Sequence, residues 1–105
     1  MKIAISGLGR MGAQIAKKLH EDGFRVVAHN RSRGPVDEMK SLGMTPAYTK
    51  EEVVNSFGKE QVILWLMVPS EVVDSELNEW LKLVPKNSIL IDGGNSDFRL
   101  TEKRA

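Results

Sequence analysis

The chain has 105 residues, and we expect one domain with a single core over residues 1–105. Its 15 Lys and Arg against 14 acidic residues give a net charge of +1, which argues against binding to nucleic acid or to a membrane surface. The absence of cysteine excludes disulfides and thiolate metal sites and favours a cytoplasmic protein. We expect no signal peptide before the first strand and no metal site. The longest apolar run, residues 62–69, is about a third of a membrane span.

An apolar strand at residues 2–6 runs directly into the pattern Gly-x-Gly-x-x-Gly, formed by Gly7, Gly9 and Gly12. Gly7 permits a tight turn, Gly9 lets the backbone approach a diphosphate, and Gly12 lets the following helix pack closely on the sheet. The diphosphate would bind at the positive N-terminus of that helix. Ordinary loops also show this glycine spacing, so its meaning depends on the rest of the chain.

The rest of the chain alternates between strand and helix patterns. Helices are predicted near residues 10–22, 34–42, 50–57 and 70–85, and strands near residues 2–6, 25–29, 45–48, 62–68 and 88–91. The predicted buried sides of the first two helices consist of Met11, Ile15 and Leu19, and of Val36, Met39 and Leu42. Thr49 and Glu52 form a capping box at the third helix. The run 62–68 is apolar without alternation, which is typical of a central parallel strand covered on both faces.

This alternation predicts an α/β fold, a doubly wound parallel sheet of Rossmann type with strand order 3-2-1-4-5. The first and fourth strands are then neighbours at the topological switch point. The loops at residues 7–12 and 67–70 should face each other across one crevice, the usual ligand site of open α/β sheets.

The turn after the second strand indicates which dinucleotide would bind. NAD-binding folds place an acid there to bind the adenosine ribose, whereas this chain has Asn30, Arg31, Ser32 and Arg33. Guanidinium groups match phosphate geometry, and a carboxylate would repel a 2′-phosphate. The sequence therefore favours NADP over NAD. An ordinary basic surface turn is the alternative.

A second group of polar residues follows the fifth strand, in the segment Asp-Gly-Gly-Asn-Ser at residues 92–96. Two glycines let the backbone approach a ligand, and Asn95 offers donors and an acceptor near the expected nicotinamide end. A structural explanation is equally open, with a Gly-Gly turn followed by a helix cap at Ser96 or Asp97.

The glycine loop, the Asn-Arg-Ser turn and above all Asp-Gly-Gly-Asn-Ser resemble the N-terminal cofactor domain of the 6-phosphogluconate dehydrogenase family. The resemblance covers essentially the whole chain and implies NADP as cofactor. It implies that residues 30–32 hold the 2′-phosphate, that residues 67–69 lie under the cofactor ribose, and that Asn95 contacts both substrate and nicotinamide. The loop after the fourth strand is about one residue shorter than the family's Pro-Ala-Gly-Glu type. The expected cofactor-binding residues are Gly7, Leu8, Gly9, Arg10, Met11, Gly12, Asn30, Arg31, Ser32, Met67, Val68, Pro69 and Asn95.

The family's catalytic lysine and glutamate lie downstream of the Asp-Gly-Gly-Asn-Ser loop, so the resemblance implies no catalytic residue within this chain. We expect a truncated cofactor domain that binds NADP without turnover, whereas the full-length enzyme would oxidatively decarboxylate 6-phosphogluconate. The chain should stop within the first turns of a helix and leave its fifth strand as an open edge, which predicts a homo-oligomer. A stand-alone NADP-sensing module, a β-hydroxyacid dehydrogenase relative and a deazaflavin-linked NADP reductase are alternatives.

Overall fold

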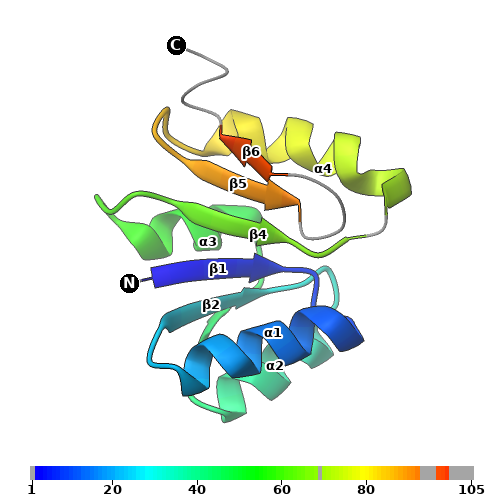
Figure 1. Ribbon diagram of the computed structural model, residues 1–105, viewed down its shortest axis with the longest axis vertical. Coiled ribbons are helices and arrows are strands. Elements are labelled where there is room, and N and C mark those ends of the chain that lie inside the picture. Colours follow the sequence, from blue (N-terminus) through cyan, green and yellow to red (C-terminus); the bar gives the residue numbers. More distant parts are fainter. Residues whose placement is uncertain (1, 69, 93–96, 100–105) are drawn as a thin grey trace.

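The computed structural model describes residues 2–68, 70–92 and 97–99, and shows one sheet with helices on both of its faces (Figure 1). The sheet has six strands in the order β3-β2-β1-β4-β5-β6, and the predicted order of the first five is confirmed. Neighbouring strands from β3 to β5 are parallel, and β6 is antiparallel to β5. The strands are β1 (Lys2–Ser6), β2 (Arg25–His29), β3 (Thr45–Ala47), β4 (Ile63–Leu66), β5 (Ile89–Asp92) and β6 (Asp97–Arg99).

The four helices divide between the two faces of the sheet because right-handed crossovers run in opposite directions on either side of β1. The helices are α1 (Arg10–Glu21), α2 (Arg33–Ser41), α3 (Lys50–Phe57) and α4 (Ser70–Leu83), close to the predicted bounds. On β1, Ala4 packs with the α3 and α4 side, whereas Ile3 and Ile5 pack with the α1 and α2 side. Each face therefore has its own apolar cluster.

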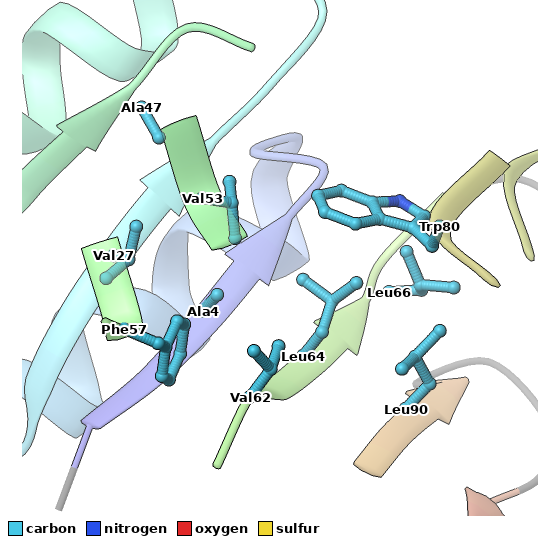
Figure 2. Close-up of a cluster of buried hydrophobic side chains, with 10 residues drawn as sticks. All are labelled: Ala4, Val27, Ala47, Val53, Phe57, Val62, Leu64, Leu66, Trp80 and Leu90. Atoms are coloured by element: carbon cyan, nitrogen blue, oxygen red, sulfur yellow. The ribbon is translucent and has the colours of Figure 1, made fainter. Parts of the chain in front are cut away.

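The cluster beneath α3 and α4 covers one face of the sheet (Figure 2). Phe57 from α3 and Trp80 from α4 are at most 2% exposed and pack with Leu64 and Leu66 of β4. Figure 2 shows these side chains converging on the sheet from separate elements. Val53 of α3 and Val73 of α4 are also buried on this side. The core thus holds β1 and β4 side by side. The loops that follow these two strands then lie on either side of a crevice at the carboxyl ends of the strands.

Two helix positions predicted to be buried are exposed. Met11 is 64% exposed and Leu42 is 47% exposed. On α1 the small residues Gly12 and Ala16 are buried, while Ile15 only packs at the margin of the cluster. Helical spacing identifies a face but not its width. Met11 lies in the first turn of α1 and Leu42 is the C-cap of α2, so both are at helix ends, where contact with the sheet is least.

The prediction of a central parallel strand covered on both faces is confirmed, since β4 lies between β1 and β5 and packs on both sides, but the two faces are covered unequally. Leu64 and Leu66 are buried, but Ile63 and Trp65 on the opposite face are only half-buried. The reason is the position of the helices on that face, where α1 contacts β1 and β2 while α2 contacts β2 and β3. In the described part of the chain, neither of these helices lies squarely over β4.

The predicted open edge at β5 is also wrong, because β6 pairs with β5 in antiparallel register from Ile89↔Arg99 to Ile91↔Asp97. The residues expected to begin a helix after the Asp-Gly-Gly-Asn-Ser loop are a strand instead. An open edge offers unpaired N–H and C=O groups, and a following segment that turns back satisfies them. The homo-oligomer stays a prediction, without its argument from an open edge.

The start of α3 confirms the predicted capping box. The Thr49 hydroxyl accepts a hydrogen bond from the Glu52 N–H at 3.1 Å, and the Glu52 carboxylate accepts one from the Tyr48 N–H at 2.7 Å. The first bond satisfies an N–H group that the first turn of the helix leaves free, and the second satisfies the N–H of the residue before the N-cap. They also fix the direction in which Lys50, the first residue of α3, leaves the β3 side of the sheet.

Candidate functional site

The glycine loop is fixed by its neighbours on both sides. The Gly7 N–H donates to the His29 carbonyl at 3.0 Å, and the Met67 N–H donates to the Ser6 carbonyl at 2.7 Å. Gly7 has a φ of +100°, and a Cβ there would lie 2.3 Å from the Met67 carbonyl oxygen. The loops that follow β1 and β4 are therefore in contact, as the predicted topology requires, and only glycine fits between them.

Gly12 and Gly9 serve different purposes. A Cβ on Gly12 would lie 1.9 Å from the Gly7 carbonyl oxygen, so this glycine lets α1 pack closely on its own loop. A Cβ on Gly9 would meet no described atom within 4 Å, and Gly9 is an N-cap without a capping side chain. The first-turn N–H groups of α1 face open space, where an anion is favoured by both hydrogen bonding and the helix dipole.

Asn30 connects the glycine loop to the turn after β2. Its side-chain carbonyl accepts a hydrogen bond from the Leu8 N–H at 2.9 Å, and its NH₂ group donates to the Ser32 carbonyl at 3.4 Å. The Leu8 side chain is only 5% exposed and packs in the core. The two hydrogen bonds of Asn30 therefore fix the position of the turn that carries Arg31 relative to the glycine loop. The position of Asn30 in the sequence does not reveal this role.

A cavity of about 410 Å³ lies at the carboxyl ends of β1, β2 and β4. Six residues expected to bind the cofactor line it, namely Gly7, Gly9, Asn30, Arg31, Met67 and Val68. Five others do not line it, namely Leu8, Arg10, Met11, Gly12 and Ser32. Pro69 and Asn95 lie outside the described residues. The structure thus brings the glycine loop, the turn after β2 and the loop after β4 to one site.

Sequence reasoning did not identify Ser6, Val72 and Glu76, which also line this cavity. Val72 and Glu76 are four residues apart on α4 and so share one face of that helix. The signal that could have found them is the predicted crevice itself, because α4 follows directly from the loop after β4. Glu76 is 8% exposed, and its carboxylate lies 3.5 Å from the Lys50 ammonium.

A buried histidine contacts Ser6, one of the residues that line the cavity. His29 Nδ1 lies 2.8 Å from the Ser6 hydroxyl oxygen, and the His29 ring meets Trp80 edge to face with 5.5 Å between ring centroids. Burial, and secondly the charge of Lys50, lower the pKa of His29 from 6.5 to about 4. His29 is therefore neutral at pH 7, and its ring adds no positive charge to the site.

Arg31 and Arg33 have different environments. Arg31 lines the cavity and also a second hollow of about 480 Å³ beside it, which Lys82 and Glu79 line as well. The Arg33 guanidinium instead lies over the Tyr48 ring, 4.5 Å from its centroid. Of the two arginines proposed from the sequence to meet a phosphate, the structure places Arg31 at the cavity.

Within the described residues, no group of three or more histidine, aspartate or glutamate side chains could hold a metal ion. None of the helices there is long and apolar enough to cross a bilayer. The residues that line the cavity include one guanidinium and one carboxylate, and the cavity lies beside the N-terminus of α1. A guanidinium and a helix N-terminus are groups that suit a phosphorylated ligand.

The parallel sheet, the uncapped helix N-terminus and the crevice between β1 and β4 together define a Rossmann-type nucleotide-binding domain. The chain belongs to the 6-phosphogluconate dehydrogenase family, since residues 2–105 match the family model for the NAD binding domain of 6-phosphogluconate dehydrogenase. The predicted resemblance is confirmed. The family is one of dehydrogenases, and its domain implies a nicotinamide cofactor.

Two curated relatives are decarboxylating 6-phosphogluconate dehydrogenases. The protein of Aggregatibacter actinomycetemcomitans is 33% identical over 97% of this chain, and that of Staphylococcus epidermidis is 36% identical over 98%. The chain spans only 22% and 23% of their lengths. Synechocystis arogenate dehydrogenase shares the fold, with a TM-score of 0.72 and 18% identity over 86% of this chain and 31% of that structure.

Proposed function

We propose that this chain binds NADP in the cavity at the carboxyl ends of β1, β2 and β4, as the cofactor domain of an NADP-dependent 6-phosphogluconate dehydrogenase. The observation that carries the proposal is that Gly9 and Arg31 line one cavity. The open backbone at Gly9 and the N-terminus of α1 suit the diphosphate. Arg31 suits the 2′-phosphate, because a guanidinium group can donate two parallel hydrogen bonds to it.

The residues present fit a dinucleotide in two further respects. The wall formed by Met67, Val68 and Val72 is apolar and suits the uncharged parts of a nucleoside. The contacts among Gly7, Asn30 and the loop after β4 hold the walls in place before a ligand arrives, which lowers the entropic cost of binding. When bound, NADP supplies a hydride acceptor, and the role of this chain is to bind and orient it.

The reaction of the whole protein is part of the same proposal. By family, it would oxidise and decarboxylate 6-phosphogluconate, with Asn95 contacting substrate and nicotinamide. The family's catalytic lysine and glutamate have no counterpart in this chain, and proton transfer needs a positioned group. We therefore expect that the chain alone binds NADP but gives no turnover. Steady-state formation of NADPH from 6-phosphogluconate by this polypeptide would contradict that expectation.

Calorimetric titration with NADP and NAD tests the assignment of Arg31. Arg31→Ala should weaken NADP binding about tenfold or more while changing NAD binding little, since charge-assisted bonds contribute about 1.5–3 kcal/mol. Arg33→Ala is the matched control, because Arg33 lies over Tyr48 and does not line the cavity. An equal loss in both arginine variants, or an equal loss for NAD and NADP in Arg31→Ala, would contradict the proposed role.

A further inference from the structure

The cavity is lined by an acidic residue that is distant in the sequence from the turn after β2. Dinucleotide-binding folds that use NAD place an Asp or Glu at the carboxyl end of the second strand, where it binds the adenosine ribose. The turn after β2 has no acid, but Glu76 of α4 lines the same cavity as Asn30 and Arg31. A carboxylate from a different element therefore lines the same cavity as the turn after β2.

The carboxylate of Glu76 is held there by an incomplete ion pair. Its partner among the described residues is Lys50, at 3.5 Å, and Lys50 lies closer to Glu79, at 2.8 Å. One ammonium group thus serves two carboxylates. Glu76 is the buried member of the three, with 11% of its side chain exposed, so it lies where charge is weakly screened.

The groups that face Glu76 leave it able to accept further hydrogen bonds. A carboxylate offers about four acceptor sites. Among the described residues, the Lys50 ammonium donates to Glu76, at the long distance of 3.5 Å. His29, which lines the second hollow beside this cavity, is neutral at pH 7 and does not compensate the charge. Arg31 lines the same cavity from the side of β2. The cavity therefore holds a positive group that attracts a phosphate, Arg31, and a negative group that repels it, Glu76.

We propose that Glu76 is a specificity-determining residue of the cofactor site, which accepts hydrogen bonds from the adenosine ribose hydroxyls and disfavours a 2′-phosphate. Glu76 therefore raises the affinity for NAD and lowers that for NADP, opposing Arg31. This inference rests on the proposed function, since it requires a dinucleotide in this cavity. The discrimination of the protein between the two cofactors is the balance between Arg31 and Glu76.

The test compares two variants that remove the same charge from the same helix. Glu76→Gln keeps the size of the side chain and should shift the ratio of dissociation constants about tenfold towards NADP, measured by calorimetry. Asp74→Asn removes an exposed carboxylate of α4 that lines neither this cavity nor the second hollow beside it, and should shift the ratio less than about threefold. An unchanged ratio in Glu76→Gln, or equal shifts in both variants, overturns the inference.

A second variant covers the possibility that Glu76→Gln does not fold, which thermal unfolding would reveal. Glu76→Asp keeps the charge but draws the carboxylate back by one methylene, and should weaken NAD binding about threefold or more. Unchanged NAD binding in Glu76→Asp also overturns the inference. If Arg31→Ala behaves as expected while the Glu76 variants do not, only this inference fails. Absence of binding of NAD and NADP to the unaltered protein overturns it together with the proposed function.

Discussion

Lowering the pH should destabilise the protein through His29. In the folded protein its pKa is lowered from 6.5 to about 4, first because burial disfavours the charged ring and then because Lys50 lies nearby. Unfolding restores the ordinary pKa, so between pH 6.5 and 4 the unfolded chain binds a proton that the folded protein does not. The contribution of neutral His29 to stability is therefore complete above pH 6.5 and is lost progressively as the pH falls.

The size of the effect follows from the two pKa values. Each pH unit between them corresponds to about 1.4 kcal/mol, so the whole interval corresponds to an upper bound of about 3 kcal/mol. Lowering the pH only from 7.5 to 5 avoids most carboxylate titration and should still reduce the free energy of unfolding by about 2 kcal/mol. That is a large part of the roughly 5–15 kcal/mol expected for a domain.

Urea denaturation at a series of pH values between 7.5 and 5 measures this loss. His29→Asn removes the titrating ring but keeps a group that can bond the Ser6 hydroxyl, so its stability should fall much less over the same range. His20→Asn, at the other histidine of the chain, is the control and should keep the pH dependence of the unaltered protein. Equal slopes for the unaltered protein and His29→Asn would refute the reasoning.

Three further substitutions separate the roles of the residues around the glycine loop. Gly9→Ala should change stability by less than about 0.5 kcal/mol, because its Cβ meets nothing within 4 Å, yet weaken dinucleotide binding at least about tenfold by filling that space. Gly12→Ala should lower stability by about 1–3 kcal/mol, because its Cβ would lie 1.9 Å from a carbonyl oxygen; an unchanged melting temperature would contradict this. Asn30→Ala should lower stability by about 1–2 kcal/mol in urea denaturation, since it leaves the Leu8 N–H without its acceptor, and an unaltered midpoint would contradict the role of this bond.

The order and type of the first nine elements could be predicted from the sequence, because they depend on local patterns. Helical spacing, glycine stops and the Thr49 capping box act within a few residues, and the continuous apolar run at β4 indicates a central strand whatever surrounds it. Strand alternation with helices then restricts the topology, since parallel neighbours require right-handed crossovers. For the same reason, the glycine loop and the loop after β4 could be placed at one crevice in advance.

The extent of burial depended on contacts that no local pattern contains. Met11 and Leu42 have the spacing of buried residues but lie at helix ends, and Trp65 is half-buried because the helices on its face cover other strands. Asp97–Arg99 is a strand because β5 offers it unpaired backbone groups. These outcomes depend on the position of neighbours that are distant in the chain.

The balance of charge at the candidate site depends on the tertiary structure. The turn after β2 contains no acidic residue, so its sequence predicts that Arg31 attracts a 2′-phosphate. Folding brings Glu76 of α4 and Lys50 of α3 to the same end of the sheet. The interaction of charges depends on their distance in space and on burial, not on their separation along the chain. A pattern confined to one turn therefore identifies the kind of site, whereas the balance of charges within it is a property of the fold.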